Sequence, residues 1–156
     1  MTVTDFINQV FLNEYKQLVK HHYVSFALIA LGVEMLGACL DGYPFGEKNK
    51  SATRFKSAIG DLFPPSYCQH KDLLCDDLRN GFAHQFRPTS GLWLTNRAES
   101  AREGTKHLSL FKDRLILVAE DLYQDFEEAC KKMTGMIAEG SLSHAKLSEP
   151  FLTVTL

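Results

Sequence analysis

The sequence predicts a mainly α-helical protein that forms a single domain over residues 1–156, with four to five helices in a bundle and one small β-hairpin. Apolar residues recur at three- and four-residue spacing along most of the chain, which is typical of amphipathic helices. Proline and glycine clusters separate these periodic segments. A chain of 156 residues with 45% hydrophobic and 23% charged residues can also bury a core.

Capping residues and apolar spacing predict the first two helices. Thr2 or Thr4 can cap a first helix that runs to about Lys20. A second helix spans residues 23–40, and its bulky face consists of Phe26, Ile29, Val33, Leu36 and Leu40. Small side chains surround Glu34 on this helix, at Ala27, Ala30 and Ala38. We therefore expect another helix to pack close to Glu34.

Two more helices follow a turn-rich segment at residues 41–50. Ser51 can cap a short third helix, which the proline pair at positions 64 and 65 ends. The next helix begins at Pro65 or Ser66, because proline is tolerated in a first helical turn. Pro88 cannot continue a helix and disfavours helical geometry at the residue before it. This helix therefore ends between His84 and Arg87, with His84 at its exit.

The hydrophobic pattern changes after Pro88. Leucines alternate with other residues near positions 92–95 and 108–111, which predicts a hairpin insertion over residues 88–111 around the polar loop Arg97–Thr105. Trp93 either packs beside the leucines or stacks on a nucleic-acid base. A last helix spans residues 112–138. Residues 139–156 form a C-terminal tail, whose segment Phe151–Leu156 pairs as an edge strand or docks on a dimer partner.

The fourth helix carries Arg79, Asn80 and His84. The spacing Arg-Asn-x-x-x-His resembles the signature of the HEPN superfamily, small helical domains of which many are metal-independent endoribonucleases, often toxins or defence proteins. The resemblance covers roughly residues 3–138. It implies a HEPN-like bundle, a homodimer in which two motifs share one cleft, an RNA substrate, no metal and no cofactor. The resemblance also implies an antitoxin or another protein as a further partner.

The residue types at this motif suit RNA cleavage. Imidazole, with an unperturbed pKa near 6.5, can take the proton of a ribose 2′-hydroxyl, and a guanidinium can hold charge that grows on the phosphate. His84 and Arg79 are thus the catalytic candidates, and Asn80 supports them. Residues five apart on a helix are separated by about 140° around its axis, so one copy forms an incomplete site. Gly81 is explained if backbone comes close to a partner there.

Glu34 is the second supporting candidate, because a carboxylate at a packing surface is costly unless it is paired. Arg79 and His84 are its attractive partners, and a solvated edge or an unrelated lysine is the alternative. Arg79 can instead pair with Asp76, and His84 can simply complement the helix dipole. A non-catalytic HEPN-like module that binds a nucleotide, RNA or a protein is therefore the alternative function. The chain also reads His84-Gln85-Phe86 where several family members have His-x-Tyr, so modification of that tyrosine is not expected.

Charge is unevenly distributed along a chain of net charge -2. The stretch from residue 79 to residue 107 has an excess of basic residues, and those outside the motif are candidates for RNA binding: Arg87, Arg97, Arg102 and Lys106. A solvated loop of mixed charge is the alternative interpretation.

The cysteines and the N-terminus indicate a cytoplasmic protein. Cys39, Cys68, Cys75 and Cys130 lie far apart, without a CxxC pair, which favours free buried thiols over a disulfide or a zinc site. The N-terminus lacks the order of a signal peptide. The apolar stretch at residues 24–40 is shorter than the roughly 20 residues that a bilayer requires and contains Glu34, so we expect a core helix and no membrane association.

Overall fold

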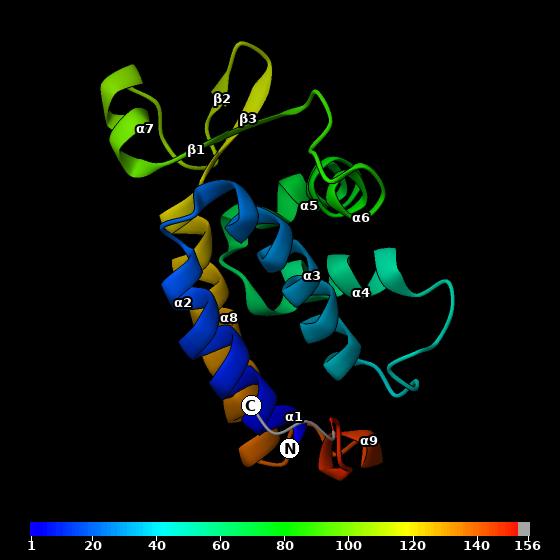
Figure 1. Ribbon diagram of the computed structural model, residues 1–156. Helices are drawn as coiled ribbons and strands as arrows, with labels where there is room; N and C mark the ends of the chain where they lie inside the picture. Colours follow the sequence, from blue (N-terminus) through cyan, green and yellow to red (C-terminus); the bar gives the residue numbers. More distant parts are fainter. Residues whose placement is uncertain (153–156) are drawn as a thin grey trace.

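The computed structural model describes residues 1–152 and is mainly α-helical, with a small three-stranded sheet at one end (Figure 1). The helical part begins with an unbroken helix made of α1 (Val3–Phe6), a π-helical segment (Ile7–Glu14) and α2 (Tyr15–Leu18). Thr2 caps it, because its hydroxyl accepts a hydrogen bond from the Asp5 backbone N–H and the Asp5 carboxylate accepts one from the Thr2 backbone N–H. The predicted cap and the predicted first helix are confirmed.

The second helix, α3 (His22–Leu40), is the centre of the core. It packs mainly against α4 (Ser51–Leu62) and α8 (Ala119–Ala138). A side chain at Gly37 would overlap the carbonyl group of Arg54, so glycine is required where α4 crosses α3. By length and composition α3 could cross a membrane, but more than half of it is buried inside the protein, as in a core helix.

The fourth helical segment runs from Pro65 to Gln85 and changes its winding three times. A 3₁₀ turn (Pro65–His70) leads into α5 (Lys71–Leu73), a π-helical segment (Leu74–Asn80) and α6 (Gly81–Gln85). Phe86 ends it in the left-handed conformation, with φ of 54°. The predicted helix boundaries are confirmed at both ends.

The predicted hairpin is wrong in its pairing. The strand β1 (Leu92–Thr95) pairs in parallel with β3 (Arg114–Val118), and the antiparallel partner of β3 is β2 (Leu110–Phe111). The predicted polar loop is instead the helix α7 (Arg97–Glu103). Because residues 114–118 belong to the sheet, α8 begins at Ala119 rather than at Lys112.

The C-terminal part folds back on the N-terminal helix. After the short helix α9 (Ala145–Ser148), the Phe151 ring packs edge-on against the rings of Phe6 and Phe45. The Phe151 backbone donates a hydrogen bond to the Met1 carbonyl at 3.0 Å. Phe151 therefore docks on its own chain, and residues 153–156 of the predicted edge strand lie outside the described residues.

All four cysteines are free thiols. Cys39, Cys75 and Cys130 are buried, as expected, whereas Cys68 is exposed on the 3₁₀ turn that opens the fourth helical segment. The expectation of buried thiols is thus correct for three of the four and wrong for Cys68.

Candidate functional site

Arg79 lies on the π-helical segment and faces α3. Its Nε donates to Glu34 Oε2 at 2.7 Å, and its Nη1 donates to Asn80 Oδ1 at 2.9 Å. The side chains of Arg79 and Glu34 are 15% and 22% exposed, so this ion pair is partly shielded from water. Glu34 therefore has one of the two partners predicted for it, and the alternative pairing of Arg79 with Asp76 is absent from residues 1–152. π-Helical turns often occur at functional sites because they displace side chains from the regular spacing.

Arg79 and Glu34 line a hollow of about 340 Å³ on the surface. The other lining residues are mostly apolar: Leu31, Met35, Ala38, Phe45 and Phe151, with Arg54 as a second cation. No acceptor in the described part of the chain contacts Nη2 of Arg79. One edge of this guanidinium is thus available to an anionic group that enters the hollow.

His84 is exposed on the last turn of α6 and does not line this hollow. Within residues 1–152 its ring makes no hydrogen bond and no ion pair, with Arg79 or with any other side chain. One chain therefore brings together Arg79, Asn80 and Glu34 and leaves His84 apart from them. This matches the separation of about 140° that five residues of helix impose.

The segment after His84 folds back along the helix that carries the motif. A Cβ atom at Gly81 would lie 2.5 Å from the carbonyl oxygen of Arg87, so this glycine is required by the chain's own return. The expectation that a partner's backbone explains Gly81 is corrected by this contact. Tyr23 on α3 donates a hydrogen bond at 2.7 Å to the carbonyl of Phe86, whose side chain is 61% exposed.

The four RNA-binding candidates fall into two groups. Arg97 forms an ion pair with Asp121 on α8 at 2.6 Å, and Arg102 pairs with Glu99 and Glu103 of its own helix. Arg87 and Lys106 are exposed and have no acidic partner among residues 1–152. The predicted basic region is therefore partly neutralised on α7 and remains cationic on either side of it.

Trp93 lies on β1 in the sheet. Its ring meets the ring of Phe111 at a centroid distance of 5.4 Å in an edge-to-face arrangement. Trp93 is only partly exposed, and this contact favours the packed alternative.

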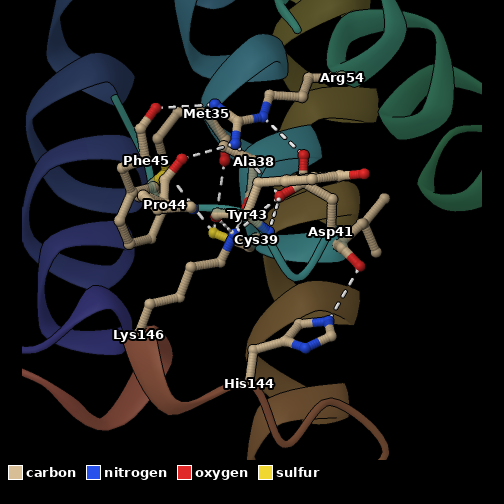
Figure 2. Close-up of polar contacts among 11 residues, drawn as sticks. Met35, Ala38, Cys39, Asp41, Tyr43, Pro44, Phe45, Arg54, His144 and Lys146 are labelled. Atoms are coloured by element: carbon tan, nitrogen blue, oxygen red, sulfur yellow. Dashed lines mark hydrogen bonds and ion pairs between the residues drawn. The ribbon is translucent and has the colours of Figure 1, made fainter. Parts of the chain in front are cut away.

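A second polar cluster, the Asp41–Arg54–Lys146 cluster, lies at the end of α3 (Figure 2). Arg54 is 5% exposed and forms an ion pair with Asp41 at 2.7 Å, and Lys146 reaches the same carboxylate at 2.9 Å. Arg54 also donates to the backbone carbonyls of Pro44 and Phe45, and Lys146 donates to those of Ala38 and Tyr43. The cluster ties the segment between α3 and α4 to the C-terminal part of the chain.

The ionisation of Asp41 follows from these contacts. Its partial burial opposes ionisation, but hydrogen bonds from Arg54, Lys146 and the Tyr43 backbone outweigh this effect and lower the pKa of Asp41 to about 2. The sequence carried one signal for this cluster, an arginine inside the apolar face of a helix between Ser51 and Leu62, and that signal was missed.

His107 belongs to a partly buried chain of hydrogen bonds near the base of the sheet. The Val118 backbone donates to His107 Nδ1 at 3.0 Å, which leaves the ring proton on Nε2, 2.7 Å from the Tyr67 hydroxyl. Tyr67 then donates to Asp125 at 2.7 Å. Burial lowers the pKa of His107, because the charged ring would lose its water. His107 is therefore held neutral as part of the fold, whereas His84 is open to solvent.

Comparisons of this chain with protein-family models, with curated proteins and with solved structures find no match. Among the described residues, no three His, Cys, Asp or Glu side chains converge as they do in a metal site.

Proposed function

We propose that this protein is a HEPN-like, metal-independent endoribonuclease that cleaves RNA to a 2′,3′-cyclic phosphate. In this proposal His84 takes the proton of the ribose 2′-hydroxyl and Arg79 holds the phosphate as its charge grows. Asn80 and Glu34 orient the guanidinium. The observation that carries the proposal is the hydrogen-bonded set of Arg79, Asn80 and Glu34, which leaves one guanidinium edge open to a hollow, on the same short helical stretch as a solvent-exposed histidine.

The proposal includes a homodimer. His84 and Arg79 of one chain do not share a pocket, so a complete site requires His84 of one copy beside Arg79 of another. We expect light scattering at micromolar concentration to give the mass of a dimer, with the segment 79–84 in the interface. A strict monomer under these conditions would remove the composite site from the proposal.

RNA is the proposed substrate, and Arg87, Arg97, Arg102 and Lys106 are the proposed contacts to its backbone. Arg97 and Arg102 would first have to exchange their acidic partners for phosphate, whereas Arg87 and Lys106 are available directly. A role as a toxin or a stress or phage-defence factor, with an antitoxin or other protein partner in the cytoplasm, accords with the HEPN resemblance.

The decisive experiment incubates the purified protein with mixed RNA in EDTA. We expect cleavage by the wild type and at least a 100-fold loss in His84→Ala, since a general base contributes about 10²- to 10⁴-fold. An all-deoxy strand should stay intact because it lacks the attacking hydroxyl. Activity that persists in His84→Ala would reject the assignment.

A second candidate function is supported by the separation of His84 from the hollow. The cavity beside Arg79 has apolar walls and one available guanidinium edge, which suits a nucleotide or another anionic ligand held without chemistry. Such a module, bound to a nucleotide, RNA or a protein, predicts no turnover of any RNA by the wild type. It also predicts loss of ligand binding in Arg79→Ala.

A further inference from the structure

A second hollow, of about 460 Å³, lies beside the end of α6 and the start of β3. Its polar lining comes from Gln85, Arg87, Thr89, Ser90 and Arg114. His84 does not line this hollow, but Gln85, the next residue in the chain, does. Arg114 could not be singled out from the sequence alone, because residue 114 was assigned to the last helix.

The loop that forms this hollow is held firmly on the fourth helical segment. The Thr89 backbone N–H donates a hydrogen bond to the Asp77 backbone carbonyl at 3.2 Å. The Gly91 backbone N–H donates one to the Asp77 carboxylate at 2.8 Å. A side chain at Gly91 would overlap that carboxylate, so the contact depends on glycine. The Leu115 backbone in turn donates to the Gly91 carbonyl at 2.9 Å, which ties the loop to β3. The loop hydroxyls and both arginines thus stand on a preformed frame.

The hollow is cationic. None of its lining residues is acidic, and neither Arg87 nor Arg114 has an acidic partner among residues 1–152. Within residues 1–152 the side chain of Arg87 makes one hydrogen bond, from Nε to the neutral Gln85 Oε1 at 3.2 Å. Asp113 precedes Arg114 in the chain but does not line the hollow. The other exposed arginines, Arg97 and Arg102, are both paired with carboxylates.

Two guanidinium groups and two hydroxyls around one hollow are the donors that phosphate oxygens accept. We propose that Arg87 and Arg114 form a phosphate subsite that holds the backbone of single-stranded RNA next to His84. This inference rests on the proposed ribonuclease function and extends it to the path of the substrate. The subsite binds one phosphate without reading sequence, because its donors reach the backbone and not the base edges.

The test uses a 2′-O-methyl RNA strand, which cannot be cleaved, and measures its affinity by fluorescence anisotropy over a range of salt concentrations. Each phosphate contact contributes about 0.7 to the slope of log K against log [salt] for a single strand. We therefore expect Arg87→Ala and Arg114→Ala each to lower the slope by about 0.7 and the affinity by about five-fold near 0.1 M salt. Arg114→Glu should lower the affinity further, through repulsion of the phosphate.

Lys48→Ala is the matched control, because Lys48 is exposed, unpaired within residues 1–152 and located on the segment between α3 and α4. Circular dichroism checks that each variant is folded, and Arg87→Lys and Arg114→Lys, which keep the charge, should recover most of the slope. Slopes for Arg87→Ala and Arg114→Ala equal to that of Lys48→Ala would overturn the inference, as would a wild type that does not bind the strand.

Competition with inorganic phosphate and with a mononucleotide separates a site for free phosphate from one for the RNA chain. Inhibition by millimolar phosphate without any change of slope in the variants would reject RNA as the ligand.

The two proposals fail in different ways. A wild type that cleaves RNA while Arg87→Ala and Arg114→Ala bind normally would reject the subsite and leave the ribonuclease standing. If the wild type does not cleave RNA but Arg87→Ala and Arg114→Ala both bind RNA more weakly than it does, the ribonuclease is rejected and the subsite is kept.

Discussion

Arg54 and Arg79 line the same hollow but differ in how their donors are used. Arg54 is 5% exposed and makes four hydrogen bonds, two to Asp41 and two to backbone carbonyls. Arg79 is 15% exposed and makes two, to Glu34 and Asn80. Four of the five N–H donors of Arg54 are thus engaged by the fold, whereas Arg79 keeps more of its donors unpaired within residues 1–152.

The difference separates two uses of a buried cation. An arginine most of whose donors meet acceptors of its own chain holds segments together and has little capacity for a ligand. An arginine that a single carboxylate holds through Nε is also fixed in orientation, but the opposite edge of its guanidinium can still bind an anion. Stability measurements should therefore respond mainly to Arg54, and activity measurements to Arg79.

The largest effect on stability is expected for Arg54→Ala. The substitution leaves Asp41 with Lys146 as its remaining cationic partner and removes the donors to two carbonyls, and loss of one member of a buried ion pair costs about 3–5 kcal/mol. Urea unfolding monitored by circular dichroism measures this change. A loss below about 1 kcal/mol would show that Arg54 is not the more structural of the two arginines.

Arg79→Ala should destabilise the fold less and abolish RNA cleavage. Hydrogen bonds to charged groups contribute about 1.5–3 kcal/mol, and Glu34 remains partly solvated after the change. Arg79→Lys is the control that keeps the charge but not the planar fork, so it should restore stability more than activity. Normal cleavage by a folded Arg79→Ala protein would remove the phosphate clamp from the mechanism.

Acid should weaken the Asp41–Arg54–Lys146 cluster. Because the pKa of Asp41 is lowered to about 2 in the folded protein, from 3.8 unfolded, its ionised form stabilises the fold above pH 3.8, and this contribution is lost as the pH falls toward 2. The difference in urea midpoint between wild type and Asp41→Asn should therefore shrink between pH 5 and pH 2.5. A constant difference over this range would contradict the assignment of the lowered pKa to Asp41.

Glu34→Gln should have the smallest effect on stability of the four changes. The amide still accepts a hydrogen bond from Arg79, but it removes the negative charge beside the guanidinium, so we expect altered cleavage or an altered pH dependence in a folded protein. Initial rates at a series of pH values, with matched circular dichroism spectra, measure this. A pH–rate profile identical to the wild type would mean that Glu34 only supports the helix packing.

The helices were predictable because their local signals agree with their packing. Thr2 with Asp5, the proline at position 65 and the stop imposed by Pro88 mark helix ends through backbone chemistry alone. The ion pair of Glu34 with Arg79 was also foreseeable, since a carboxylate among small side chains on a core helix requires a partner. The catalytic roles of Arg79 and His84 remain predictions.

The sheet was harder to predict because its pairing is not local. Leu115 to Val118 form a short, continuous apolar run, and such a run suits a buried strand as well as a helix. The alternating leucines near residues 92 and 108 favoured a hairpin, although Asn96 followed by Glu99 is a helix-start signal and Gly104 a helix-stop signal. Use of these two capping signals would have placed α7 correctly and left β1 in need of another partner.

The exposure of Cys68 has a practical consequence for the study of assembly. Burial raises the pKa of Cys39 to about 12 and also raises the pKa of Cys75 and Cys130, so these thiols are poor nucleophiles in the folded protein. A maleimide dye should therefore attach first to Cys68, at the far end of the helical segment from His84. Mixed donor- and acceptor-labelled copies would then report subunit exchange by energy transfer, without any engineered cysteine.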